Sequence, residues 1–364
     1  MRIKLGKKRK IVGYASNSNA PNFNYWLLHM LAKEFGFDTF FFREKDIDKE
    51  SKMINGWFPI RSGGGGIKTV QRKTSFPKII DNIDCFALAQ PNCYKEIYKE
   101  SLVLRVFKSG SKLEQDKILR NSEFSSLAIQ TYKYTGSIVD ELLKKHKRII
   151  LKPGGGFGGK GIYWLSKDES DYILHNQKEE KKVSRENLLV NYDKLFEEQG
   201  FIVQPLLNFK TISGNSSDIR LIVARGKDGN CISLDPIVRV GRPNSIVTNM
   251  SSGGYGISVN CNTFFELEYG KDAKRIIKEL AHIGKKLLDV FQKHYSKLIP
   301  SAGIDLGIDR DDNNAIKFIE INGCPGARPP ILYHYMRIRC EFYDFMNSNY
   351  GKYYDEQQKS IISI

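Results

Sequence analysis

The sequence predicts a mixed α/β (α+β) protein built from three packed units. Near the N-terminus, apolar residues follow strand, helix and strand spacing in turn between residues 10 and 42, which is typical of a βαβ unit. In the middle of the chain, a glycine-rich stretch separates two strand-like runs. From residue 201 onwards, short strand-like runs joined by turns indicate antiparallel pairs around one long amphipathic helix.

The composition is that of an ordinary globular protein. The 364 residues suffice for two or three packed units, with 41% hydrophobic and 27% charged residues. No apolar run is long enough to span a bilayer, and the basic N-terminus is not followed by the apolar segment of a signal peptide. The six cysteines show no zinc-binding spacing, which favours a reducing compartment. We therefore expect a cytoplasmic protein.

The formal net charge of +16 allows two interpretations. A basic protein can bind an acidic partner, such as a peptide or an anionic polymer. A lysine-rich composition gives the same charge without any partner, and the lysines here are dispersed along the chain. Dispersed lysines favour a solvated surface, and no known nucleic-acid motif is present, so no specific nucleic-acid partner is predicted.

The N-terminal unit should begin with a strand over residues 10–14, a helix over 24–35 and a strand over 39–42. Gly36 fits the C-cap of that helix, and a right-handed crossover is expected. Residues 63–66 are four consecutive glycines. They could bind a phosphate, but a hairpin or surface loop is favoured because no strand-to-helix context surrounds them. Residues 78–88 are apolar enough for a buried strand.

The central unit should contain two helices and a strand pair. One helix is expected to open at Asp116-Lys117 and a second to run over 137–146 behind a serine cap. Strands are expected over 148–152 and 161–165, with weak helical patterning over 167–199.

The C-terminal unit should be largely antiparallel. Strands are expected over 201–204, 217–224 and 231–240, a helix over 271–295, and a strand pair around Asp305 and Glu320 joined by a turn. The tail after Phe345 is polar and is expected at the surface.

Lys152 ends a predicted strand and precedes a loop with six glycines between Gly154 and Gly161. Glycine backbone N–H groups can approach phosphate oxygens closely because no Cβ intervenes. The loop is neither a Walker A motif, since no GK[ST] helix start follows, nor a Rossmann turn, since a strand follows it. A plain glycine-rich hairpin is the alternative.

Asp305, Glu320 and Asn322 form a second candidate site. Glu320 and Asn322 are two residues apart on a strand, so they point to one face, and Asp305 lies on the neighbouring strand. Oxygen ligands of this kind suit Mg2+ and not zinc. The alternative is a solvated strand end, but the apolar residues around these side chains favour a site. Asp309 is a further candidate ligand, although a turn role is favoured for it.

Together these segments resemble the ATP-grasp superfamily, most closely the spore-coat-associated YheC/YheD-like branch, and also the ribosomal-protein glutamate ligases. The resemblance covers roughly residues 110–330. It implies an N-terminal pre-ATP-grasp domain over residues 1–110, a central lobe over 111–200 and a C-terminal lobe with the metal site over 201–364. The residues that carry the resemblance form an ordered series: Asp116-Lys117, the Lys152 loop, Phe201 to Gln204, Ser217 to Arg220, Val238 to Gly241, Val247 to Gly254, Gly303 to Asp305 and Ile319 to Gly326.

The resemblance also implies roles by position. ATP phosphates would contact Lys117, Lys152 and the loop residues Gly155, Gly156, Gly158, Gly159 and Lys160. The adenine would lie beside a hinge formed by Gln204, Pro205, Leu206 and Leu207, and the ribose near Asp218. Two Mg2+ ions would be held by Asp305, Glu320 and Asn322. Catalytic contacts are implied for Arg220, Arg239 and Asn249, and Arg328 could anchor a substrate carboxylate or be an ordinary surface arginine.

The implied activity is ligation of a carboxylate substrate, such as an amino acid or peptide, to an amine through an acyl-phosphate, with release of ADP and phosphate. The glutamate ligases have an arginine just before the equivalent of Asn249, where this chain has Val247-Thr248. The substrate side of the resemblance is therefore weaker than the ATP side. A kinase of the same fold, or a non-enzymatic coat or assembly protein, is the alternative.

Overall fold

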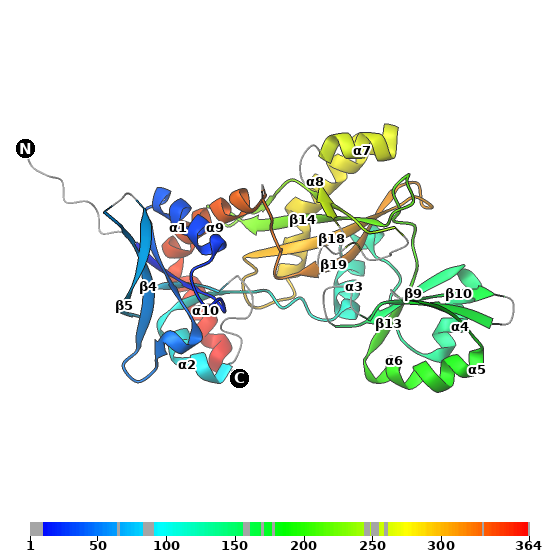
Figure 1. Ribbon diagram of the computed structural model, residues 1–364, viewed down its shortest axis with the longest axis horizontal. Coiled ribbons are helices and arrows are strands. Elements are labelled where there is room, and N and C mark those ends of the chain that lie inside the picture. Colours follow the sequence, from blue (N-terminus) through cyan, green and yellow to red (C-terminus); the bar gives the residue numbers. More distant parts are fainter. Residues whose placement is uncertain are drawn as a thin grey trace, which may run out of the picture.

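The computed structural model describes residues 10–63, 66–82, 91–155, 161–168, 171–176, 179–243, 248, 255–257, 261–329 and 331–362. Its described strands form three sheets. Figure 1 shows the N-terminal sheet at one end of an elongated molecule, the C-terminal sheet in the middle and the central-lobe sheet at the other end. The middle sheet therefore contacts both of the other units.

The N-terminal sheet confirms the predicted βαβ unit. Strand β1 (Lys10–Ala15) lies parallel to β2 (Phe37–Phe42) on one side and to β6 (Ile79–Asn82) on the other. Helix α1 (Phe23–Glu34) connects β1 to β2, and it ends before Gly36, whose φ of +79° suits a glycine. The described sheet is completed by β3 (Ile47–Asp48), β4 (Met53–Arg61), β5 (Ile67–Ser75) and β7 (Leu102–Arg105), with α2 (Pro91–Glu100) preceding β7.

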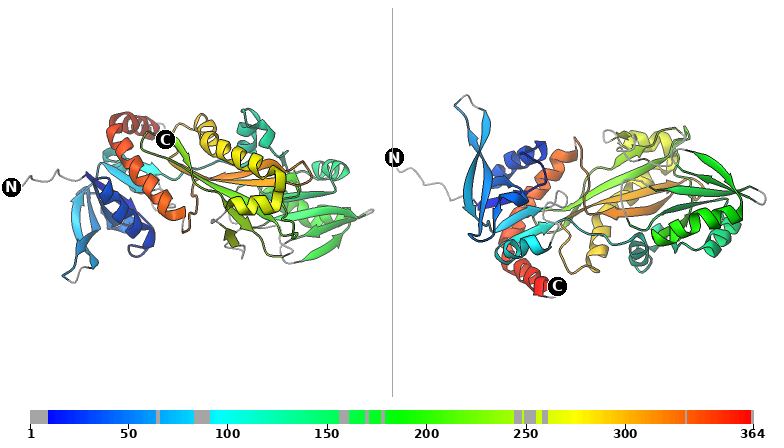
Figure 2. Two further views of the ribbon diagram at one scale, coloured as in Figure 1. Left: turned by 90° about the horizontal axis from the view of Figure 1, so that it is seen from above. Right: turned by 60° about the horizontal axis from the view of Figure 1, so that its bottom comes forward.

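The described ends of the four-glycine stretch, Gly63 and Gly66, lie between two paired strands, as expected for a hairpin. Strands β4 and β5 pair antiparallel along their whole length, and the Ser62 N–H donates to the Gly66 carbonyl at 2.8 Å. The hairpin extends away from the body of the molecule (Figure 2).

The central lobe has its own sheet and core. The predicted pairing across the glycine-rich loop is confirmed, because β9 (Arg148–Pro153) runs antiparallel to β10 (Tyr163–Asp168). The prediction of weak helix over 167–199 is partly wrong: the only buried side chains of β11 are Tyr172 and Leu174, two apart, which suits a half-exposed strand. The other elements are β8 (Tyr132–Lys133), α4 (Gly136–Lys145), β11 (Asp171–His175), β12 (Glu180–Val183), α5 (Arg185–Leu188), α6 (Lys194–Glu198) and β13 (Phe201–Pro205).

Two helix starts differ from the prediction because their caps were misplaced. Helix α4 is capped by Thr135, whose hydroxyl accepts the Ile138 N–H at 3.2 Å, and not by Ser137. Helix α3 (Lys112–Arg120) begins four residues before Asp116. The Ser111 hydroxyl accepts the Glu114 N–H, and the Glu114 carboxylate accepts the Ser111 N–H, which together form a capping box.

The C-terminal sheet is antiparallel, as predicted, in the order β17-β16-β14-β18-β19, with β15 beside β14. The predicted strand over 231–240 is divided in two around Pro236. Helix α8 (Ala273–Gln292), the predicted long helix, packs on one face of the sheet. The other elements are β14 (Ser217–Arg225), β15 (Cys231–Ser233), β16 (Ile237–Val240), β17 (Tyr255–Ile257), α7 (Cys261–Tyr269), β18 (Ser301–Asp309) and β19 (Ala315–Asn322).

The end of the chain stays largely at the surface, as expected, but it is helical. Helices α9 (Ile331–Ser348) and α10 (Tyr350–Ile362) return to the N-terminal unit (Figure 1). In α9, the buried Arg339 pairs with the buried Asp81 at 2.6 Å. In α10, Gln357 donates to the carbonyls of Tyr98 and Ser101. These polar contacts fix both helices to the N-terminal sheet.

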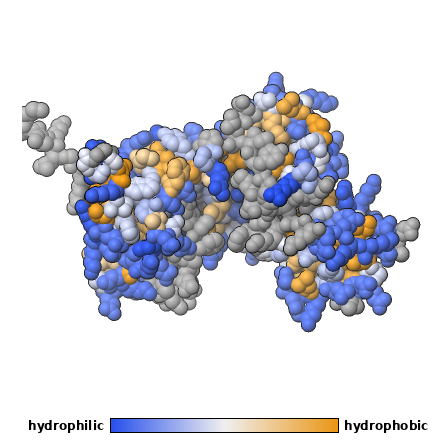
Figure 3. All heavy atoms as spheres, in the orientation of Figure 1, coloured by the Kyte–Doolittle hydropathy of each residue, from blue (hydrophilic) through white to orange (hydrophobic). Residues whose placement is uncertain are grey.

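Hydrophilic residues cover most of the face that Figure 3 shows, over the N-terminal unit and over the central lobe. Hydrophobic residues on that face occur in small groups, as on most globular proteins. Among the described helices, none combines the length and apolarity needed to cross a membrane.

Candidate functional site

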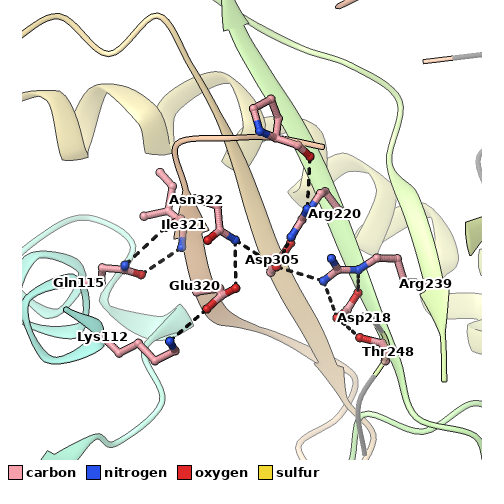
Figure 4. A network of polar contacts seen from close by, with 11 residues as sticks. Lys112, Gln115, Asp218, Arg220, Arg239, Thr248, Asp305, Glu320, Ile321 and Asn322 are labelled. Atoms are coloured by element: carbon pink, nitrogen blue, oxygen red, sulfur yellow. Dashed lines mark hydrogen bonds and ion pairs between the residues drawn. The ribbon is translucent and has the colours of Figure 1, made fainter. Parts of the chain in front are cut away.

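One face of the C-terminal sheet carries a row of charged side chains. The strand register places Asp218 opposite Arg239, Arg220 opposite Asp305, and Asp305 opposite Glu320. Alternate residues of a strand point to the same face, so these side chains meet on the face that α8 does not cover. Figure 4 shows the resulting cluster.

Asp305 is the centre of the cluster and is only 2% exposed. Arg220 donates to both of its oxygens, from Nε at 2.7 Å and from Nη2 at 2.6 Å. Arg239 approaches the same carboxylate, with Nη2 at 3.0 Å from Oδ2. Burial by itself would raise the pKa of Asp305, but the two guanidinium groups outweigh it and hold the pKa below its ordinary value.

Asp218 shares Arg239 with Asp305. Both of its oxygens accept hydrogen bonds from Arg239, and the Thr248 hydroxyl donates to one of them. Burial raises the pKa of Asp218 above its ordinary value, because only one arginine opposes the desolvation and the neighbouring Asp305 adds repulsion. The structure thus places Asp218 inside the charged cluster, while a contact with a ribose stays a prediction.

Glu320 and Asn322 meet Asp305 at the end of β19. The Asn322 Nδ2 lies 3.0 Å from the Glu320 Oε1 and 3.4 Å from the Asp305 Oδ2, so the three side chains converge. Turning the Asn322 amide would present its oxygen at the same place, which completes an oxygen set suited to a hard cation such as Mg2+. In the described part of the chain, no group of three His, Cys, Asp or Glu side chains is arranged for a metal, so a cation here would depend on Asn322.

Lys112 connects the cluster to the central lobe. Its Nζ lies 3.3 Å from the Glu320 Oε2, and its backbone N–H donates to the Gly154 carbonyl at 2.9 Å. The helix that carries it is held against β19 by Gln115, whose Oε1 accepts the Ile321 N–H at 3.0 Å. Lys112 therefore lies between the start of the glycine-rich loop and the carboxylates.

Lys152 lies near the end of β9, at the start of the same loop, and is only 7% exposed. Burial lowers its pKa to about 8; the positive charge of Lys112 adds to this shift and Glu320 opposes it. Among the described residues, no carboxylate lies within ion-pair distance of its ammonium group. Such a buried cation is ready to receive an anionic ligand.

Lys117 is not brought to the cluster. It is an exposed residue in the middle of α3, five positions beyond Lys112. Lys112 is not among the predicted site residues, because the helix is expected from the sequence to open at Asp116. The Ser-x-x-Glu pattern from Ser111 to Glu114 marks the true start and would have placed Lys112 at the first helical position.

The predicted hinge connects the central lobe to the C-terminal sheet. Gln204 is buried and donates to the Thr131 hydroxyl at 2.7 Å, and Pro205 ends β13. The Leu206 N–H donates to the Arg148 carbonyl, and Leu207 beyond it is half-buried. An Asp309 oxygen accepts the N–H groups of Asn208 and Asp311, so Asp309 has the turn role that the sequence favours.

Several predicted site residues fall elsewhere. Arg328 is exposed just before α9, and its side chain makes no hydrogen bond or ion pair with a residue of the described ranges. Gly155 is described, and a Cβ added to it would meet no described atom within 4 Å. The remaining predicted residues lie outside the described residues: Gly156, Gly158, Gly159, Lys160 and Asn249.

A protein-family model and curated proteins of one organism match this chain. Residues 107–338 match the family described as YheC/D like ATP-grasp. The endospore coat-associated protein YheD of Bacillus subtilis is 26% identical over 208 residues, which is 54% of this chain and 44% of YheD. YheC of the same organism is 24% identical over 194 residues, 52% of each chain. The chain thus spans about half the length of the curated relatives it matches.

Solved structures agree on the fold. A D-cycloserine synthetase, DcsG, has a TM-score of 0.51 at 11% identity, covering 91% of this chain and 99% of its own. A RiPP-associated ATP-grasp ligase of Chryseobacterium gregarium, in complex with ADP and peptide, has a TM-score of 0.50 at 11% identity, covering 93% and 96%. These likenesses show an ATP-grasp fold, which agrees with the family match over residues 107–338. The chain belongs to the YheC/D-like ATP-grasp family.

Proposed function

We propose that this protein is an ATP-dependent carboxylate–amine ligase, which activates a carboxylate as an acyl-phosphate and releases ADP and phosphate when an amine displaces the phosphate. The observation that carries the proposal is a pair of lysines at the border between two lobes: Lys112 contacts Glu320, and the charges of both residues affect the pKa of the buried Lys152. The fold of ATP-grasp ligases such as DcsG supports it.

The balance of charge fits a triphosphate. The cluster joins four cations with three carboxylates: Lys112, Lys152, Arg220 and Arg239 with Asp218, Asp305 and Glu320. Such a site has an excess of positive charge in a largely buried setting, where Coulomb interactions are stronger than in water. A phosphoryl group in transfer carries negative charge on its outer oxygens, and fixed cations stabilise it.

Each group would then have a distinct task. Lys152 and Lys112 would bind phosphate oxygens at the start of the glycine-rich loop, whose described residue Gly155 is unobstructed. Arg220 would orient the carboxylate that attacks the γ-phosphate, while Asp305 keeps the arginine in place. Mg2+, held by Asp305, Glu320 and Asn322, would neutralise the phosphate charge.

The test uses ATP, Mg2+, a set of amino acids and dipeptides as carboxylates, and hydroxylamine as the amine. We expect ADP, phosphate and a hydroxamate in equal amounts, because hydroxylamine intercepts an acyl-phosphate. AMP and pyrophosphate as products would overturn the proposal. A phosphorylated alcohol formed without any amine would identify a kinase, and ATP binding without turnover of any tested carboxylate would favour a non-enzymatic protein.

A matched pair of variants identifies the lysine that matters. Lys112→Met should lower turnover at least tenfold, because it removes a cation beside Glu320. Lys117→Met changes an exposed residue of the same helix and should leave turnover within about twofold. If Lys117→Met has the larger effect, the phosphate contact belongs to Lys117, as the family resemblance implies.

A further inference from the structure

A cavity lies beside the charged cluster. It has a volume of about 300 Å3, within the size range of small-molecule sites. One wall is the loop that follows β1, from Ser16 to Asn22, and the opposite wall is the Cys324–Ala327 turn with the start of α9. Because β1 lies between β2 and β6, this loop leaves the sheet where the strand order reverses, a place where α/β sheets bind ligands.

The cavity and the cluster share one structural element. Arg220, which holds Asp305, also donates from Nη1 to the Pro325 carbonyl at 3.2 Å. Pro325 and Gly326 line the cavity, so the same turn separates the two sites. A substrate in the cavity that extends past this turn would come next to the guanidinium group of Arg220.

The wall formed by the β1 loop is polar and built in advance. The Ser18 N–H donates to the Ser16 hydroxyl at 3.2 Å, and Asn22 donates to the Ser18 hydroxyl at 3.0 Å. Asn17 and Asn24 also line the cavity, and their side-chain amides make no hydrogen bond with any residue in the described ranges. Both amides are thus available to a ligand, each with donors and an acceptor.

The other wall is largely apolar: Ala327 is half-buried, and Leu332 and Met336 lie behind it, 5% and 0% exposed. Among the described residues that line the cavity, none is charged. Tyr335 is the aromatic residue on this wall, and it is 2% exposed with its hydroxyl paired to Ser301 at 2.9 Å. A sugar would find no open aromatic face here, whereas a peptide can pair its amides with one wall and place small side chains against Ala327 and Gly326 on the other.

We propose that this cavity binds an uncharged peptide segment of the substrate and presents its reacting end to Arg220. That the bound peptide is a substrate rests on the proposed ligase function. Binding of a peptide in the cavity can be measured without turnover. Asn17 and Asn24 would hydrogen-bond the peptide backbone, and the apolar wall would select small apolar side chains.

The test measures binding of acetyl-dialanine amide, which is capped at both ends and uncharged, by saturation-transfer NMR with the full chain. Asn24→Leu should weaken this binding about tenfold, as expected for loss of hydrogen bonds worth about 1.4 kcal/mol. Leucine is a good helix former, so the first turn of α1 should persist. The matched control is Asn262→Leu, an exposed residue at the start of α7, which should bind the probe as the unchanged protein does.

ADP affinity, measured on the same samples, separates this inference from the proposed function. If the protein binds ADP but not the capped dipeptide, with or without ADP, the cavity proposal is overturned and the ligase proposal stands. If it binds the dipeptide but not ADP, the ligase proposal fails instead. Stronger binding of methyl glucoside than of the dipeptide, or equal loss in both variants, would also overturn the peptide assignment.

Discussion

The buried environment of Lys152 limits the pH range in which the site can bind a phosphate. Its folded pKa of about 8 lies below the value of 10.5 for a free lysine. Between these two pH values the unfolded chain binds more protons than the folded protein, so stability rises with pH in that window. Below pH 8 the buried charge costs about 3 kcal/mol of stability.

A bound phosphate should reverse this shift, since it favours the charged form of Lys152. We expect ADP affinity to fall as pH rises through about 8, with proton uptake on binding near that pH. Calorimetry in two buffers of different ionisation enthalpy measures the uptake. Lys152→Met should remove it, weaken ADP binding and stabilise the protein at neutral pH. Identical proton uptake in both proteins would assign the titration to another group.

The two acidic residues of the predicted metal site should behave differently when neutralised. Asp305→Asn leaves Arg220 and Arg239 buried with one carboxylate fewer, and should cost about 3 kcal/mol or more of unfolding free energy. Glu320→Gln changes a partly exposed side chain and should cost less than about 1 kcal/mol. Urea denaturation measures both. Activity should be lost in both variants. The stability loss should be larger for Asp305→Asn, and equal losses would contradict the central structural role of Asp305.

At the scale of elements, the site depends on how closely α3 and β19 approach their neighbours. Gly323 follows β19 at a point where a Cβ would lie 1.8 Å from the Phe107 carbonyl oxygen. That contact is with backbone atoms, so no side-chain movement can relieve it. The segment leading into α3 must therefore pass directly over the end of β19, and only glycine permits it.

Gly323→Ala should destabilise the protein by about 3 kcal/mol or more and displace Glu320 and Asn322 from the cluster. Gly155→Ala is the matched control, because a Cβ there meets nothing within 4 Å and stability should change by less than about 0.5 kcal/mol. Thermal unfolding measures both. An unaffected Gly323→Ala variant would show that the Phe107 segment can move away.

The sequence reveals elements whose pattern is local and hides those that depend on distant partners. The βαβ unit, the strand pair around Asp305 and helix α8 follow from periodicity alone. The docking of α10 does not, because Gln357, its one buried side chain among those described, is polar and is held by backbone groups of Tyr98, Ser101 and Val103. Likewise, Asp305 and Glu320 could be paired from strand spacing, whereas the contact with Lys112 required the correct start of α3.

At the scale of the molecule, the hydrophobic cores divide the chain differently from the three predicted domains. One core joins α1 and the N-terminal strands to α9 and to one face of β14. A second core lies between the other face of β14 and α8. The core of the central lobe draws only on residues between Tyr134 and Val203. The N-terminal unit and the C-terminal sheet therefore share buried surface, while the central lobe is a separate body.

This division predicts two thermal transitions, a smaller one for the central lobe and a larger one for the rest. Leu165 and Met336 are both fully buried, one in each body. Either change to alanine should cost about 2–5 kcal/mol and lower the melting temperature of its own body by several degrees. Leu165→Ala should leave the larger transition in place, and Met336→Ala should leave the smaller one in place.

Scanning calorimetry makes the comparison. ADP should raise the temperature of both transitions, because its proposed site contacts both bodies. A single transition that moves equally with either variant would mean that the contacts of Lys112 with Gly154 and Glu320 couple the lobes into one cooperative unit.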